Sequence, residues 1–239
     1  MVEHDIDVSL DQDAIRRAPR GGLFSLQRPA WCFLIFAIGA MLLAPFSRPA
    51  QVRFHKIEIN NLFPRRDNAG NIIDAHDGCL KFFNGRYYLY GTAYGASAGY
   101  GINNRYRVYS SADLEHWTFD GELLKSPPDG VYYRPYVVYN RRTKMYVLWY
   151  NWYPKLFEGR VGVAIGKTPV GPFTIVNTRV PLTQAADRPG DGSLFVDDDG
   201  TAYFIYSVIG QDHSIWIERL TPDYLGTTRQ VSGVLGRRT

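Results

Sequence analysis

One strand-turn-strand unit recurs along this chain of 239 residues, and the repeat limits the folds that the chain can adopt. The clearest copy runs from Asp191 to Tyr206. Apolar, aromatic and β-branched residues on both sides of its turn, Asp197 to Gly200, predict two short paired strands. Similar units run from Asp77 to Tyr90 and from Arg134 to Trp149. Three copies of a hairpin favour a fold built from repeated sheets.

The three units keep a nearly constant period. Aligning their turns places three tyrosines in register at steps of 58 and 57 residues, namely Tyr88, Tyr146 and Tyr203. Another strand is expected after each hairpin, beginning near Val108, Val163 and Ile217. Because a small antiparallel sheet cannot cover both of its faces alone, such sheets pack against one another like the blades of a β-propeller. The repeat therefore predicts an all-β fold, here a partial propeller of about three blades.

The innermost strand of each blade starts at the central channel of a propeller. In this chain those starts carry Asp77, Arg134 and Asp191. Two carboxylates and a guanidinium that converge on one axis are compatible with a chemical site and equally with a structural ion-pair cluster. The small-residue segment from Gly91 to Gly101, which is too glycine-rich for a strand, is expected to be a loop that lines the same pocket.

The first part of the chain has a different character. Residues 30–46 are apolar and uncharged, and several arginines precede them. This pattern predicts a cytoplasmic tail over residues 1–28, a transmembrane signal anchor over 29–46 and a stem over 47–71. The partial propeller would then occupy residues 72–239 on the lumenal or extracellular side. Secretion after cleavage of the apolar segment is the alternative.

Composition narrows the possible partners. Aromatic residues make up 15% of the chain, which suits strands and, where rings are exposed, platforms that stack on sugars. The net charge of +4 arises without a basic patch interleaved with aromatic residues, so we expect no nucleic-acid partner. Two cysteines, Cys32 and Cys79, are expected to be buried thiols. We expect a monomer.

Four phrases of the sequence together resemble a known family. They are the run from Asp77 to Tyr88, Ser110 to Trp117 (SSADLEHW), Thr168 to Phe173 (TPVGPF) and the hairpin from Asp191 to Tyr206. In this order and spacing they are similar to glycoside hydrolase family 43, a family of five-bladed β-propellers, and to its exo-β-1,3-galactanase branch. The resemblance covers about residues 70–225. It implies an enzyme that hydrolyses O-glycosyl bonds with inversion.

The resemblance also implies roles for individual residues. Asp77, ten residues before Tyr87, matches the family's general base, which activates water. Asp191 matches the aspartate that modulates the pKa of the general acid and orients it. The acid itself is expected to be a glutamate opening a blade after Arg219, and the sequence ends before that blade, as a fragment or a truncated gene model would. Glu218 is expected to be a surface side chain.

Candidate substrate-binding residues follow from chemistry and position. They are His76, Arg134, Tyr150, Trp152 and Glu158. Arginine can hold hydroxyl groups, and aromatic faces stack on the apolar side of a sugar. The structural alternatives are a core histidine at position 76 and a Trp152 that packs between blades. No His/Cys cluster has metal-ligand spacing, so no cofactor is required, although calcium occurs in some relatives.

Two departures from the galactanase branch affect the expected substrate. That branch commonly has glutamate where this chain has Tyr133, and often has glycine where this chain has Asp77. The chain is in this respect closer to the wider family, whose members act on arabinosides and xylosides. Our hypothesis is an inverting, exo-type hydrolase of β-galactosidic or arabino/xylosidic linkages. The alternative is a carbohydrate-binding propeller without catalytic activity, or an inactive truncated product.

Overall fold

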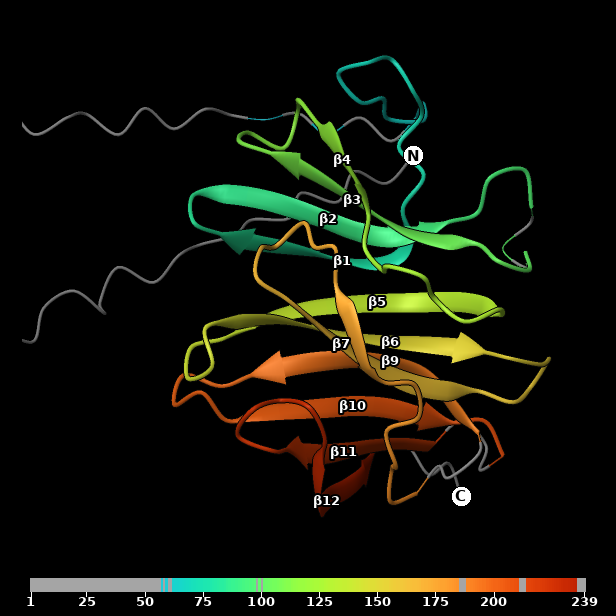
Figure 1. Ribbon diagram of the computed structural model, residues 1–239, viewed down its shortest axis with the longest axis vertical. Coiled ribbons are helices and arrows are strands. Elements are labelled where there is room, and N and C mark those ends of the chain that lie inside the picture. Colours follow the sequence, from blue (N-terminus) through green and yellow to red (C-terminus); the bar gives the residue numbers. More distant parts are fainter. Residues whose placement is uncertain are drawn as a thin grey trace, which may run out of the picture. The chain divides into compact units, whose positions relative to one another are not determined.

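The computed structural model describes residues 57, 59, 62–97, 99, 101–184, 188–210 and 214–235. These residues form three antiparallel sheets of four strands each (Figure 1). All the strands lie in the compact unit Phe54–Thr239. The tail and anchor expected over residues 1–46 lie outside the described residues. No helix in the described part of the chain is long and apolar enough to cross a membrane.

The first sheet contains β1 (His76–Phe83), β2 (Arg86–Ala93), β3 (Arg105–Ser111) and β4 (Thr118–Glu122). Its first hairpin turns at Asn84 and Gly85, both with positive φ (50° and 81°), as the Asn-Gly pair predicts. The loop expected from residue 91 begins later, because β2 continues to Ala93. Glycine is needed at position 91, where a Cβ would lie 2.3 Å from the backbone of Ala75.

The other two sheets repeat this order. The second contains β5 (Val131–Asn140), β6 (Met145–Tyr153), β7 (Arg160–Gly166) and β8 (Thr174–Asn177). The third contains β9 (Pro189–Val196), β10 (Ala202–Val208), β11 (Ser214–Leu220) and β12 (Thr227–Leu235). The last strand, β12, was missing from the sequence-based prediction. It completes a third sheet of four strands.

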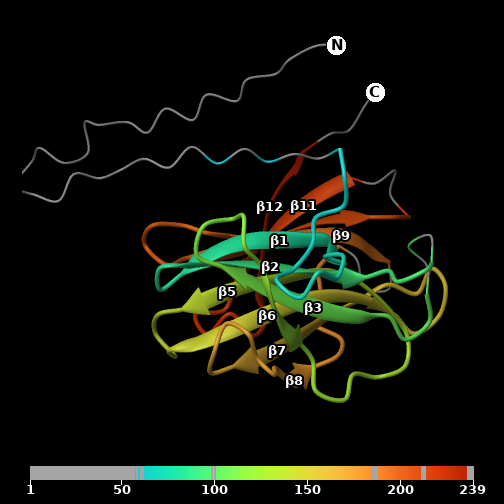
Figure 2. The ribbon, with the colours of Figure 1, turned by 90° about the horizontal axis from the view of Figure 1, so that it is seen from above.

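The second sheet lies between the other two, and the inner strands β1, β5 and β9 are neighbours in that order (Figures 1 and 2). Two hydrophobic clusters hold the sheets together. The cluster between the first two sheets is rich in tyrosine and includes Tyr90, Tyr106 and Tyr150. The cluster between the second and third sheets is richer in aliphatic residues and centres on Trp149 and Phe204, whose rings are 4.9 Å apart. Face-to-face packing of repeated sheets agrees with the predicted architecture.

The three tyrosines aligned by the repeat all lie on second strands, but they do not point the same way. Tyr88 and Tyr146 meet in one cluster from opposite sheets. Tyr203 contacts Phe195, on the face of the third sheet away from the second. The three hairpins close with two, four and five residues between paired positions, so aligning their turns does not determine which face of the strand each tyrosine occupies.

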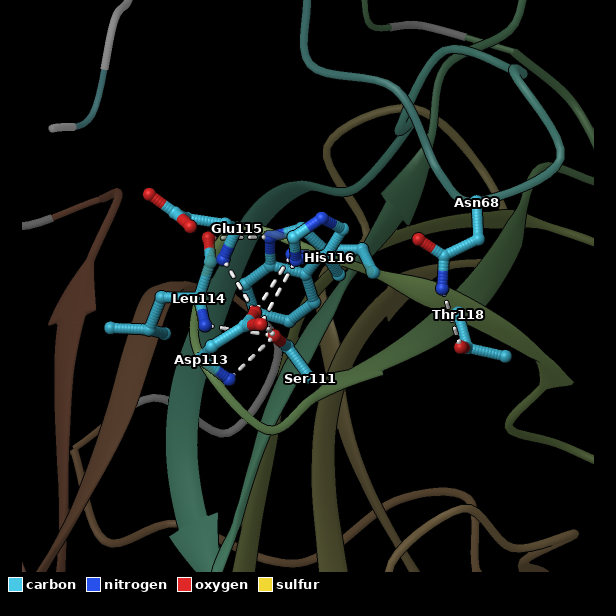
Figure 3. Close-up of polar contacts among 8 residues, drawn as sticks. Asn68, Ser111, Asp113, Leu114, Glu115, His116 and Thr118 are labelled. Atoms are coloured by element: carbon cyan, nitrogen blue, oxygen red, sulfur yellow. Dashed lines mark hydrogen bonds and ion pairs between the residues drawn. The ribbon is translucent and has the colours of Figure 1, made fainter. Parts of the chain in front are cut away.

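The phrase from Ser110 to Trp117 forms the connection between β3 and β4, and its polar residues build that turn (Figure 3). The Asp113 carboxylate accepts hydrogen bonds from the backbone N–H groups of Glu115 (3.0 Å) and His116 (2.8 Å). The His116 N–H, first among these donors, holds the pKa of Asp113 well below its usual range. The Trp117 indole is buried and donates to the Leu114 carbonyl at 2.9 Å. The phrase therefore shapes the fold and does not belong to the site.

Candidate active site at the start of the inner strands

Each inner strand carries a β-bulge within its first few residues. The pairing of β1 with β2 shifts between His76 and Cys79, and that of β5 with β6 shifts between Tyr133 and Tyr136. β9 has its extra residue between Pro189 and Gly192. A bulge leaves one residue out of the ladder and re-aims its side chain. The bulges thus present three predicted site residues, Asp77, Arg134 and Asp191, at one end of three adjacent strands.

The bulges in β1 and β5 share a left-handed backbone. Asp77 and Arg134 both have a φ of 54°, a conformation that few residues other than glycine adopt. Gly78 follows Asp77, and a Cβ there would lie 1.6 Å from the carbonyl oxygen of Tyr90. In β9, Asp191 occupies the second bulge position and has no positive φ. The third of these site residues, Asp191, is therefore offset by one residue from the repeat.

Asp77 is half-buried and is held by a neighbouring tyrosine. The Tyr94 hydroxyl donates a hydrogen bond to Asp77 Oδ2. The Tyr94 ring stacks on His76 with centroids 4.2 Å apart. No hydrogen bond in the described part of the chain uses Asp77 Oδ1. One carboxylate oxygen is thus fixed and the other is available to a ligand or water.

Asp74 anchors the loop that carries Tyr94. Its Oδ1 accepts from the Tyr94 N–H at 2.8 Å, and its Oδ2 accepts from the Gly95 N–H at 2.9 Å. His76 Nε2 and Arg107 Nη1 lie 3.4 and 3.6 Å from the same carboxylate. Asp74 and Tyr94 were not among the predicted site residues. The glycine-rich composition of residues 91–101 predicted a pocket loop without indicating which of its side chains reaches Asp77.

Arg134 and Asp191 form a bidentate ion pair. The Arg134 Nε and Nη2 atoms donate to the two carboxylate oxygens of Asp191 at 2.9 and 2.8 Å. The side chains are 36% and 69% exposed, so the pair faces solvent. A guanidinium that engages both oxygens in this way fixes the orientation of the carboxylate.

A line of tyrosine rings connects the two carboxylates. Tyr133 packs edge-on against Tyr94 at 6.4 Å and against Tyr153 at 5.7 Å. Burial, and then the negative charge of Asp191, raise the pKa of Tyr153 to about 12. Neighbouring aromatic residues thus link Tyr94, which holds Asp77, to Tyr153, on which the charge of Asp191 acts.

Two of the predicted sugar-binding residues are in the core. Tyr150 is 1% and Trp152 is 4% exposed, so neither presents a ring face to a ligand. The Trp152 indole donates to the Thr178 carbonyl at 2.7 Å, and Tyr132 stacks on its ring at 6.1 Å. The sugar-stacking prediction is wrong for both residues, and the packing alternative holds for Trp152. Alternation along β6 could not identify the buried face, because both faces of the second sheet are covered.

The remaining carboxylates of interest lie elsewhere. Glu158 is exposed in the loop after β6 and lies 3.9 Å from Lys155. Glu218, which was expected at the surface, is completely buried. Its Oε1 accepts from the Tyr206 hydroxyl and the Thr183 N–H, both at 2.6 Å. Cys79 is buried as expected, and burial raises the pKa of its thiol to about 11. No group of acidic, histidine and cysteine residues in the described part of the chain has the arrangement of a metal site.

Comparison with known proteins supports the predicted family. A family model described as glycosyl hydrolases family 43 matches residues 72–237. The arabinoxylan arabinofuranohydrolase of Bacillus subtilis (strain 168) is 27% identical over 169 residues, which cover 57% of this chain and 32% of that protein.

Solved structures in the same family are also similar. The exo-β-1,3-galactanase of Phanerochaete chrysosporium, solved with β-1,3-galactotriose, has a TM-score of 0.64 and 29% identity, covering 72% of this chain and 42% of its own. The exo-β-1,3-galactanase of Clostridium thermocellum has a TM-score of 0.62 and 30% identity, covering 74% and 40% of the two chains. This chain thus spans less than half the length of each of these relatives.

Proposed function

This chain belongs to glycosyl hydrolase family 43, and from that premise we propose that it contributes the active site of an inverting, exo-type glycoside hydrolase. The supporting observation is the pair of carboxylates, Asp77 and Asp191, held in different ways on the two inner strands, β1 and β9, that flank β5. The proposed substrates are β-galactosidic or arabino/xylosidic linkages of a glycan. Relatives named for galactan and for arabinoxylan support this range.

Asp77 is proposed as the general base. Tyr94 occupies Oδ2, which leaves Oδ1 to take a proton from a water molecule. The water oxygen then forms a bond to the anomeric carbon while the bond to the leaving oxygen breaks. Attack from the face opposite the leaving group inverts the configuration. His76, stacked beside Tyr94 and 52% exposed, is proposed to contact the sugar at this position.

Asp191 is proposed to orient the general acid and to modulate its pKa. Both Asp191 oxygens are held by Arg134, so this carboxylate is not the one that activates water. The acid must protonate the leaving oxygen from a position about 6.5–9.5 Å from the base. Glu158 and Glu218 do not suit this role, since one lies near Lys155 and the other is in the core. The proposed turnover therefore requires a further glutamate.

A carbohydrate-binding protein without turnover is the second candidate. It is favoured by one observation, namely that no third carboxylate joins Asp77 and Asp191 among the described residues at the bulges. The exposed Arg134–Asp191 pair and the ring of His76 would then hold a sugar without cleaving it.

We also propose that residues 29–46 anchor a monomer to a membrane with the sheets on the lumenal or extracellular side. The supporting observation is the uncharged apolar run with arginines ahead of it. Carbonate extraction of membranes from expressing cells tests the anchor. Release of the protein into the soluble fraction would support secretion instead.

The catalytic proposal is tested by sugar release. The 239-residue chain and the full product of its gene are incubated with β-1,3-galactotriose and with nitrophenyl β-galactoside, α-arabinofuranoside and β-xyloside. Proton NMR of the first product should show the anomer inverted from the substrate. The double variant Asp77→Asn/Asp191→Asn is the blank. Binding without release by both proteins would establish the second candidate, and release with retained configuration would reject the proposed mechanism.

A further inference from the structure

A hollow lies toward the opposite end of the inner strands, where β5 and β9 run into their turns. It is a groove of about 940 Å³, bordered by the ends of β1, β5 and β9 and by the turns that follow β5 and β9. On β5 the lining begins at Tyr136, two residues after Arg134, and continues to Asn140, the last residue of the strand. None of the three bulge residues Asp77, Arg134 and Asp191 lines it.

Aromatic side chains border the groove on both sides of β5. Phe82 on β1 is 58% exposed and Phe195 on β9 is 52% exposed. Tyr136 lies between them on β5, with the Lys81 ammonium 4.1 Å from its ring centroid. Aromatic rings that remain exposed beside a hollow can cover the apolar face of a ligand.

The two turns bring charges of both signs to the groove. Arg141 and Arg142 lie on the β5–β6 turn, and neither guanidinium makes a hydrogen bond or ion pair with a described residue. Asp198 lies on the β9–β10 turn, and among the described residues only its backbone N–H is bonded, to Asp197 Oδ1 at 2.8 Å. Donors and acceptors are therefore both available, on turns that close neighbouring hairpins.

This mixture selects one class of ligand. The carboxylates of Asp197, Asp198 and Asp199 would repel a polyanion, and the cations of Lys81, Arg141, Arg142 and Arg219 would repel a polycation. A neutral sugar has hydroxyl groups that donate to carboxylates and accept from guanidinium groups. It also has an apolar face that stacks on aromatic rings.

We propose that this groove binds a neutral oligosaccharide, as a second glycan site separate from the bulge residues. Phe82 and Phe195 supply stacking surfaces, while Asp198 and Arg142 supply hydrogen bonds to hydroxyl groups. The groove would keep a polysaccharide on the protein independently of chemistry at the other end of the strands. The proposal does not depend on hydrolysis, so its test uses binding alone.

The test is an NMR titration of the isotope-labelled 239-residue chain with β-1,3-galactotriose, arabinotriose or xylotriose. Saturable shifts are expected for the amides of 81–83, 139–142 and 195–201 with at least one of these sugars. Trigalacturonate, which carries negative charge, is the comparison ligand and should bind more weakly. Asp191→Asn removes a bulge carboxylate and should leave the groove shifts and their dissociation constant unchanged.

Substitutions at exposed positions test whether the groove binds the sugar without destabilising the fold. Phe82→Ala and Phe195→Ala should each weaken binding roughly tenfold, as expected for loss of a stacking surface. Asp198→Ala, on an exposed turn, should weaken binding about threefold to tenfold. Phe63→Ala is the matched control, since Phe63 is 76% exposed and lies outside the groove.

Each result decides the proposal. Saturation that is lost in the Phe82→Ala/Phe195→Ala double variant and kept in Phe63→Ala supports it. Shifts confined to residues around Asp77 and Asp191, or no saturable shift with any neutral trisaccharide, overturn it. Tighter binding of trigalacturonate overturns the assignment of a neutral ligand. The outcome of the sugar-release experiment bears on the catalytic proposal alone and leaves this binding result standing.

Discussion

Asp77 and Asp191 both occupy bulges near the start of an inner strand, yet their surroundings differ. Asp77 is half-buried, and a neutral hydroxyl from Tyr94 holds one of its oxygens. Asp191 is 69% exposed, and the Arg134 guanidinium holds both of its oxygens. Because both residues are aspartates, residue type alone does not show which one can accept a proton. Their partners determine which one has an oxygen available for a proton, and hence which one we assign as the base.

The largest expected effect tests this assignment directly. Asp77→Asn should lower kcat roughly 10³-fold with little change in KM, because the water loses its proton acceptor. Azide attacks without deprotonation, so adding it should restore turnover in Asp77→Asn. It should not do so in Asp191→Asn. Nitrophenyl release measures both variants, and azide rescue of Asp191→Asn alone would exchange the two roles.

A second prediction concerns the bulge that carries Asp77. Gly78→Ala should lower the free energy of unfolding by about 3 kcal/mol, since the added Cβ would meet the Tyr90 carbonyl oxygen at 1.6 Å. Urea denaturation measures the change. Gly226→Ala is the control, because nothing lies closer than 3.9 Å to a Cβ at that position. Equal stability of the two variants would show that the β1 bulge does not depend on glycine.

The hydroxyl that holds Asp77 should have a smaller effect. Tyr94→Phe keeps the ring stacked on His76 and removes only the donor, so kcat should fall about tenfold with KM nearly constant. Tyr133→Phe is the matched control, because the Tyr133 hydroxyl donates to the Gly99 carbonyl at 2.7 Å and not to a carboxylate. Steady-state kinetics should separate the two variants. Similar losses in both would assign Tyr94 a packing role only.

The smallest expected effect is a change in the pKa of Tyr153. Burial, followed by the charge of Asp191, raises the pKa of Tyr153 to about 12 from 10.0. Because the folded value lies above the ordinary one, this tyrosine adds stability below pH 10 that is lost as the pH rises toward 12. Asp191→Asn should lower the pKa of Tyr153, whereas Asp77→Asn should not. Ultraviolet absorbance of the tyrosinate, with Tyr153→Phe to identify the signal, measures it.

The repeat and its strands could be predicted because short-range patterns determine them. The Asn84-Gly85 turn and the alternation around Tyr203 each indicate a hairpin without knowledge of the rest of the fold. The strand β12 escaped prediction because Thr227–Leu235 contains glycine and little regular alternation. The sequence also placed Asp77, Arg134 and Asp191 together, because innermost strands of repeated sheets begin at one end.

Side-chain direction was harder to predict than strand position. The burial of Tyr150 and Trp152 depends on a second sheet covered on both faces, which alternation cannot reveal. Tyr88, Tyr146 and Tyr203 follow turns of two, four and five residues, so aligning the turns did not predict which face of its strand each ring occupies. Tyr94 reaches Asp77 through a loop anchored by Asp74, a contact between residues that no local pattern links.

The left-handed backbone at Asp77 has an evolutionary consequence. Glycine adopts a φ of 54° at least as readily as aspartate does, so Asp77→Gly would remove the carboxylate without straining the backbone. Selection for a folded protein therefore does not protect this carboxyl group. If Asp77 is the proposed base, only selection for hydrolysis retains it, and a single codon change would then separate the proposed enzyme from the proposed sugar-binding scaffold.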